Sequence, residues 1–183
     1  SVAVAVILVR ELSVVDYAGY TAISGLLIAL MVISSGGLER VLPRYFPELR
    51  PAKAEPELKS FCWSLLLLRL AFLVVFLLPL VLAYPLISNW LKLPADDALM
   101  WTFALYALMF GMGLHLSRSL QALLLQRSAT TGLAVEWFSK LAILLAWLFY
   151  HRQISLFDAV WIQGSTAALG NLYMLVALHR HFV

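Results

Sequence analysis

The chain has 183 residues, of which 63% are hydrophobic and only 13% are charged, and its formal net charge is +3. A soluble domain carries about 25% charged residues, and a soluble fold of this length lacks the interior to bury so much apolar surface, so the composition predicts an all-α integral membrane protein. The basic residues are dispersed among acidic ones and form no patch interleaved with aromatic residues, which excludes a nucleic-acid partner.

The first two hydrophobic stretches lie at residues 1–9 and 21–41. The first stretch is too short to cross a bilayer, so we interpret it as the remaining part of a first helix whose start is absent from the chain. Residues 10–16 are expected to form a short polar connection. Tyr17 and Tyr20 precede the second stretch, at the place where membrane proteins commonly have a belt of aromatic side chains.

Residues 40–59 are the most polar part of the chain and contain four prolines, which favours a loop between two spans. The hydrophobic stretch that follows covers residues 61–83. We expect it to be helical to about Leu82 and then to end in a kink or an interfacial turn, because Pro79 and Pro85 lie in this region.

Three more hydrophobic stretches complete the expected set of spans, and they cover residues 98–117, 129–150 and 156–178. A short loop is expected at residues 88–97. Residues 118–127 are expected to form an amphipathic extension or a tight connection. The chain has one cysteine, which excludes an internal disulfide.

The distribution of basic residues predicts how these spans are oriented. If the 40–59 loop faces the cytoplasm, eight of the 13 Lys and Arg residues lie on the cytoplasmic side, three lie on the outer side and two lie within spans. The positive-inside rule favours this arrangement, which also makes the C-terminal end of the chain cytoplasmic.

Two cations and one acid lie away from the ends of the expected spans, where ionisable side chains mark functional sites by default. Arg69 lies about 12 Å from Phe61 along its helix, at 1.5 Å per residue, and is expected either to reach a hydrated cavity or to snorkel to the headgroups. Glu136 and Lys140 are four residues apart, so they are expected to pair on one helix face. The alternative role for them is a coupling site for a proton or another ion.

Three segments resemble motifs of the Wzx-like polysaccharide and oligosaccharide flippases, which belong to the multidrug/oligosaccharidyl-lipid/polysaccharide (MOP) exporter superfamily. Residues 16–20 (DYAGY) are similar to the family's turn of an acidic residue, aromatic residues and a glycine after its first helix. Residues 37–48 (GLERVLPRYFPE) are similar to the pattern after its second helix. Residues 120–127 (LQALLLQR) are similar to the connection between its fourth and fifth helices.

The resemblance implies a MATE-like transporter of two six-helix lobes, of which this chain would supply the N-terminal lobe with a truncated first helix. The second lobe would then be absent from the chain. The implied function is the flipping of an undecaprenyl-diphosphate-linked oligosaccharide across the bacterial inner membrane by alternating access. No enzymatic reaction, cofactor or metal is implied. The implied partners are the lipid-linked sugar, the bilayer, the second lobe, and proteins of polysaccharide synthesis or export.

The resemblance also implies a hydrated, cationic cavity for the diphosphate, to which a planar guanidinium donates bidentately. Arg44 matches the family motif and is expected either at the mouth of this cavity or as a plain anchor at the inner headgroups. Arg69 and Lys140 are expected to line the cavity, and Glu136 is the candidate for ion coupling. Replacing Arg69 by alanine is then expected to abolish export and to leave membrane insertion intact.

Three other functions compete with flipping. A drug or solute exporter of the same superfamily would need acidic cavity residues, and Glu136 is the one acid that lies away from the ends of the expected spans. A non-transporting membrane subunit of a polysaccharide complex would need no cavity. A membrane-embedded enzyme is disfavoured, because the expected outer loops are short and neither H-E-x-x-H nor G-x-S-x-G occurs.

Overall fold

The computed structural model describes residues 2–38, 41, 44–45, 55–94, 96–151 and 153–182. Within these residues the chain forms seven helices and no strand, which confirms the all-α prediction. The helices are α1 (Val2–Glu11), α2 (Val14–Ser35), α4 (Glu55–Leu82), α5 (Tyr84–Leu91), α6 (Asp97–Ala122), α7 (Gln126–His151) and α8 (Leu156–His181).

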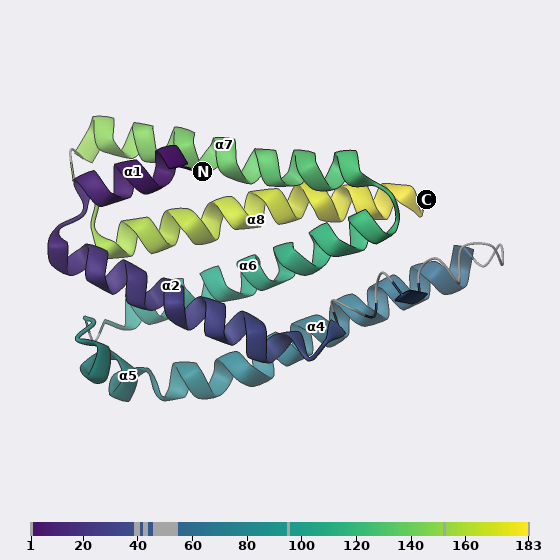
Figure 1. Cartoon of the computed structure of the whole chain (residues 1–183), viewed down its shortest axis with the longest axis horizontal. Helices are drawn as coiled ribbons and strands as arrows, with labels where there is room; N and C mark the ends of the chain where they lie inside the picture. The colour runs from purple at the N-terminus through teal and green to yellow at the C-terminus, as the bar shows by residue number, and fades with distance from the viewer. Residues whose placement is uncertain are drawn as a thin grey trace.

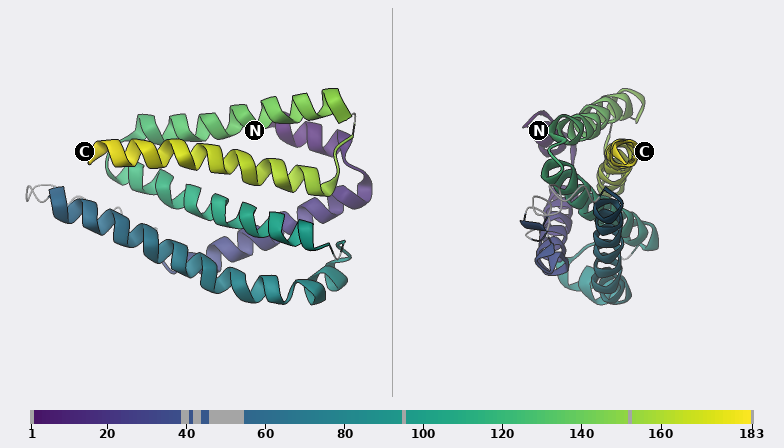
Figure 2. Two further views of the ribbon diagram at one scale, coloured as in Figure 1. Left: turned by 180° about the vertical axis from the view of Figure 1, so that it is seen from behind. Right: turned by 90° about the vertical axis from the view of Figure 1, so that its right-hand side faces the viewer.

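The helices are arranged around α6 (Figure 1). The most extensive contact of α6 is with α8, and α6 also contacts α2, α4 and α7. α7 packs against α8 as well as α6, and the short α1 packs against α7. The end-on view in Figure 2 places α7 on one side of α6, and α2 and α4 on the other. Helices α2 and α7 therefore pack on different sides of the same central helix, α6.

Four helices, α2, α4, α6 and α7, are long and apolar enough to cross a membrane. Leu67, Val75 and Leu78 on α4 are among many large apolar side chains that are exposed at the outside of the bundle. Such side chains are favourable next to lipid and unfavourable next to water. The structure thus agrees with the multi-pass membrane protein that the composition predicts.

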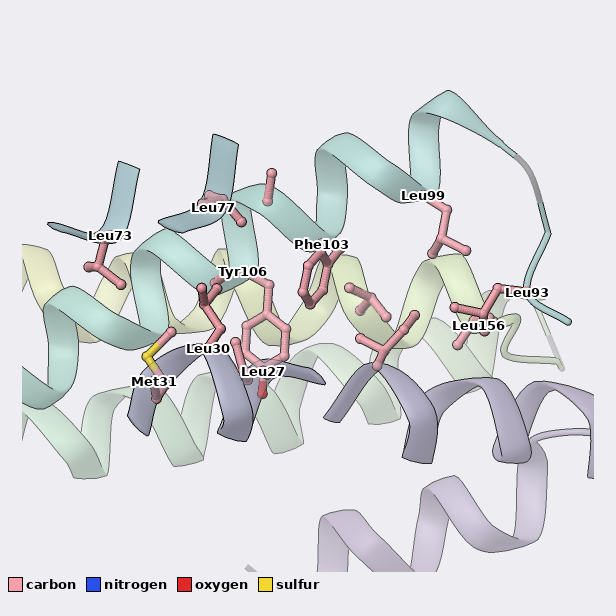
Figure 3. Close-up of a cluster of buried hydrophobic side chains, with 14 residues drawn as sticks. Leu27, Leu30, Met31, Leu73, Leu77, Leu93, Leu99, Phe103, Tyr106 and Leu156 are labelled. Atoms are coloured by element: carbon pink, nitrogen blue, oxygen red, sulfur yellow. The ribbon is translucent and has the colours of Figure 1, made fainter. Parts of the chain in front are cut away.

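A buried apolar cluster joins α2, α4, α6 and α8 (Figure 3). Leu27 and Leu30 of α2 lie next to Phe103 and Tyr106 of α6 in this cluster, and Leu73 of α4 closes it from the other side. Burial of this apolar surface, together with close packing between helices, positions α2 against α6.

The prediction of a polar connection at residues 10–16 is wrong, because α1 continues to Glu11 and α2 already begins at Val14. Ser13 is the N-cap of α2, and its hydroxyl accepts a hydrogen bond from the backbone N–H of Asp16 at 3.0 Å. The Ser13 hydroxyl also donates to the Asp16 carboxylate at 2.8 Å. This capping interaction starts the helix before the apolar run, so that polar residues lie in its first turns.

The prediction that the third hydrophobic stretch is helical to about Leu82 and then turns is confirmed, since α4 ends there and α5 begins at Tyr84. The loop predicted at residues 88–97 is shorter than expected, because α5 extends to Leu91. The Tyr84 hydroxyl donates to the carbonyl of Pro94 at 3.0 Å and so closes this loop onto α5. Burial, with a smaller contribution from the nearby Asp96 carboxylate, raises the pKa of Tyr84.

Both parts of the prediction for residues 118–127 occur: residues 118–122 extend α6, with Arg118 exposed and Leu120 buried, and residues 123–125 form a tight connection. α6 continues to Ala122, α7 begins at Gln126, and Leu124 in the turn between them has a φ of +63°. Helices α6, α7 and α8 differ by a few residues at their ends from the stretches predicted at 98–117, 129–150 and 156–178, and α8 is not among the four helices that are long and apolar enough to cross a membrane. Most of the predicted 40–59 loop lies outside the described residues, and its last five residues, 55–59, belong to α4.

Glycines allow α7 and α8 to approach each other closely. A Cβ atom added to Gly170 of α8 would lie 3.0 Å from the carbonyl oxygen of Gly132 and 3.0 Å from Cβ of Glu136, both on α7. A Cβ at Gly164, also on α8, would lie 3.3 Å from the Cα of Tyr106 on α6. Small residues commonly allow this backbone-to-backbone packing in membranes. Gly170 in particular holds α7, and Glu136 with it, in place.

We expect the substitution Gly170→Leu to separate α7 from α8 and to destabilise the protein by about 2 kcal/mol, since overpacking strains the backbone. The measurement is the unfolding temperature of the detergent-solubilised protein. Gly25→Leu is the matched control, because a Cβ atom added to Gly25, on the spanning helix α2, would have no neighbouring atom within 4 Å. An equal unfolding temperature for the two variants would contradict the packing role of Gly170.

Candidate functional site

A groove runs along α6 in the described part of the chain, and we call it the α6 groove. It consists of a cleft of about 290 Å³ between α6 and α7 and a cleft of about 380 Å³ between α2 and α6. Phe110, Leu114 and Arg118 line both clefts. They follow one another at intervals of four residues and so lie on one face of α6, which forms the floor of the groove.

The walls of the α6 groove come from the two neighbouring helices. α2 contributes Ile28, Met31, Val32 and Ser35, and α7 contributes Leu133 and Glu136. The polar side chains in the α6–α7 cleft, apart from Glu136, lie toward the end of α6 and are Ser117, Arg118 and Gln121. The groove therefore combines apolar walls with a polar end, an arrangement that suits an amphipathic ligand.

Arg118 is the cation on the floor of the α6 groove. Its side chain is exposed, and it makes no hydrogen bond or ion pair with another described residue. It lies one turn before the end of α6, where the helix dipole favours a positive charge. The guanidinium is thus charged, accessible and available for an anion.

From the sequence alone, Arg118 is expected only in the connection at residues 118–127 and is not among the predicted site residues. The signal that points to it is its spacing from Phe110 and Leu114 on one helix face, with Ser117 and Gln121 beside it. That pattern identifies a partly polar helix face near a span end. It does not say which neighbouring helix covers that face, and this is decided by the packing of α2 and α7.

Glu136 and Lys140 form the predicted ion pair on α7. Lys140 Nζ donates to Glu136 Oε1 at 3.1 Å, and the side chains of Lys140 and Glu136 are 4% and 13% exposed, respectively. The ammonium also lies 4.4 Å from the centre of the Trp137 ring, a cation–π distance. Glu136 lines the α6–α7 cleft, whereas Lys140 is buried and is not among its lining residues. Because the ammonium of Lys140 lies beside it, the carboxylate of Glu136 adds little net negative charge to the groove.

Arg69 does not line either cleft of the α6 groove. Its side chain is 1% exposed, so it does not snorkel to the headgroups. One terminal nitrogen, Nη1, donates to the carbonyl oxygen of Ser34 at 2.5 Å, and Nη2 lies 3.7 Å from the sulfur of Met31. Arg69 on α4 thus binds the last turn of α2.

Arg44 has an exposed side chain whose guanidinium carbon lies 5.6 Å from the centre of the Tyr45 ring. It is not among the lining residues of the two clefts. Of the four predicted site residues, only Glu136 lines the α6 groove. Lys140 does not line it but pairs with Glu136. Arg69 and Arg44 lie outside the groove.

Several further polar side chains are buried in the bundle. Gln163 Nε2 on α8 donates to the Tyr20 hydroxyl on α2 at 2.7 Å. Asn171 Nδ2 on α8 donates to the carbonyl of Met109 on α6 at 2.6 Å. These bonds link α8 to α2 and α6, which is the common use of polar side chains between spanning helices. No group of three or more potential metal ligands occurs in the described part of the chain.

Comparison of the chain with protein-family models, with curated proteins and with solved structures gives no match. The likeness to the flippase family therefore rests on the sequence motifs alone.

Proposed function

We propose that this chain is one lobe of a Wzx-like exporter that moves a polyprenyl-diphosphate-linked oligosaccharide across the bacterial inner membrane. The observation that supports this proposal most directly is Arg118, an exposed cation without a described partner on the floor of a groove between membrane-spanning helices. A guanidinium donates two parallel hydrogen bonds to a phosphate, so Arg118 is suited to a diphosphate.

The charge balance of the α6 groove favours an anionic ligand. Arg118 carries a full positive charge, whereas the carboxylate of Glu136 is 3.1 Å from the ammonium of Lys140 and is largely neutralised by it. The hydrocarbon layer is about 30 Å thick, and a charged headgroup crosses it only where a polar surface replaces water. The apolar wall of Ile28 and Val32 on α2 matches the polyprenyl chain.

The proposed exporter would work by alternating access between this lobe and a second lobe, with the lipid-linked sugar between them. Its further partners would be proteins of polysaccharide synthesis or export. The turn between α6 and α7 lies at the end of the bundle where α8 ends (Figure 1). Arg118, near the end of α6, and Arg127, at the start of α7, flank this turn. Under the positive-inside rule this is the cytoplasmic end. A diphosphate synthesised in the cytoplasm would then enter the α6 groove at the end that carries Arg118.

We expect Arg118→Ala to reduce transport of the lipid-linked oligosaccharide about tenfold or more, since a charge-assisted bidentate contact is lost. The measurement is the movement of a fluorescently labelled polyprenyl-diphosphate oligosaccharide across proteoliposomes that contain the intact protein. Arg127→Ala is the control, because Arg127 is basic and at the same end but lines neither cleft. Unchanged transport by Arg118→Ala, at equal protein content, would remove Arg118 from the proposed site.

A cation exporter of the same superfamily is the second candidate, because the carboxylate of Glu136 lines the α6–α7 cleft. The same proteoliposomes separate the two functions. Accumulation of a cationic dye that depends on Glu136, without transport of the diphosphate lipid, would favour the cation exporter. Transport of the diphosphate lipid that depends on Arg118 would favour the flippase.

A further inference from the structure

A third cleft lies away from the α6 groove, between the start of α7 and the end of α8. It has a volume of about 300 Å³ and shares no lining residue with the α6 groove. Leu125 and Ser128 line it on the α7 side, and Tyr173, Arg180 and His181 line it on the α8 side. We call it the α7–α8 cleft.

The mouth of the α7–α8 cleft is basic. Arg180 and His181 are exposed, and none of the lining residues is acidic. Arg180 makes no hydrogen bond or ion pair with another described residue, and the Ser128 hydroxyl adds a further hydrogen-bond donor. The polar groups at this mouth match the phosphate of a ligand.

An apolar strip leads from this mouth toward the middle of α8. Leu169, Tyr173, Val176 and Arg180 are spaced by four, three and four residues, so they lie on one face of the helix. The three apolar members are 45%, 39% and 40% exposed, respectively. A chain of methylene groups laid along this strip would begin next to the Arg180 guanidinium and continue into the hydrocarbon layer.

We propose that the α7–α8 cleft binds an anionic phospholipid of the surrounding leaflet, with its phosphate at Arg180 and one acyl chain along Val176, Tyr173 and Leu169. Basic pockets between spanning helices on the cytoplasmic side commonly hold anionic headgroups. The end of the bundle with this cleft carries the excess of basic residues, so the charge of the leaflet and the charge of the cleft are complementary. The proposal does not rest on the transport function, because the α6 groove takes no part in it.

The test compares retention of phosphatidylglycerol and phosphatidylcholine by the intact protein in detergent, measured by native mass spectrometry and by the lipid-dependent rise in unfolding temperature. The wild-type protein is expected to retain phosphatidylglycerol and to be stabilised by it, and to respond weakly to phosphatidylcholine. Arg180→Ala is expected to weaken phosphatidylglycerol binding about fivefold, the effect of one basic residue near an anionic surface. Lys92→Ala, a basic residue in the loop at the opposite end, is the control and is expected to bind as the wild type does.

A second variant keeps the test independent of any folding defect in Arg180→Ala. Ala177→Trp fills the α7–α8 cleft without changing its charge and is expected to displace the lipid as well. Circular dichroism confirms that each variant retains its helices. Equal retention of the two lipids by the wild type, or wild-type binding by folded Arg180→Ala and Ala177→Trp, would overturn the proposal.

Discussion

Replacing Lys140 by methionine is expected to destabilise the protein by about 3 kcal/mol or more, because it leaves the Glu136 carboxylate without its partner in an apolar setting. The side chains of Lys140 and Glu136 are 4% and 13% exposed and their charged atoms are 3.1 Å apart, so neither charge is well solvated by water. The measurement is the unfolding temperature of the protein in detergent.

The double variant Glu136→Gln with Lys140→Met separates the charge effect from a packing effect. It removes both charges and is expected to recover most of the stability that Lys140→Met loses, because replacing a whole buried pair is often close to neutral. The ammonium of Lys140 also lies over the Trp137 ring, and the double variant loses this cation–π contact. We therefore expect the double variant to remain slightly less stable than the wild type. Since methionine keeps the apolar length of the lysine side chain, a double variant as unstable as Lys140→Met would mean that the contact of Lys140 with the Trp137 ring, and not the ion pair, accounts for the loss.

The second large effect is expected at Arg69, where substitution by alanine should destabilise the protein by about 3 kcal/mol through the combined loss of a large buried side chain and a hydrogen bond. Arg69 donates to the carbonyl of Ser34 in the last turn of α2, where carbonyls have no partner within the helix. The guanidinium also places a positive charge at the negative end of the α2 dipole. The readout is thermal unfolding, together with protease sensitivity at the end of α2.

Arg69→Lys tests this capping role, because it keeps the charge and shortens the reach. It is expected to retain more stability than Arg69→Ala. Loss of export in Arg69→Ala would therefore not by itself show that Arg69 binds the substrate. The loss of the contact between α2 and α4 would be enough to cause it. An Arg69→Ala protein that unfolds at the wild-type temperature and fails to export would instead support a direct role of Arg69 in the cavity, as the flippase resemblance implies.

The two intramembrane charge sites show why sequence reasoning succeeded at one and not at the other. Glu136 and Lys140 are four residues apart on one helix, so their pairing depends only on helix geometry and was predicted correctly. The partner of Arg69 is the carbonyl of Ser34, 35 residues away on another helix. An arginine in an apolar run has the same local sequence whether it faces a cavity, a headgroup or a neighbouring helix end.

Helix boundaries show the same division. Ser13 and Asp16 form the cap of α2 from residues three apart, so a search for capping patterns identifies that start from the sequence. Polarity alone suggests a loop there, because the first turns of a capped helix are polar as well. By contrast, the close approach of α7 to α8 at Gly170 depends on Gly132 of another helix, and no local pattern contains it.

The sequence by itself determined that this protein is all-helical, with several helices apolar enough to cross a membrane, and it determined the Glu136–Lys140 pair. These properties follow from composition, from the length of apolar runs and from spacing along one helix, all of which are local. Only the tertiary structure decided that Arg118 lies on the floor of a groove while Arg69 is buried against α2. The physical reason is that the environment of a side chain is set by helices distant in sequence, and the packing of α2 and α7 against α6 decides which cation meets solvent.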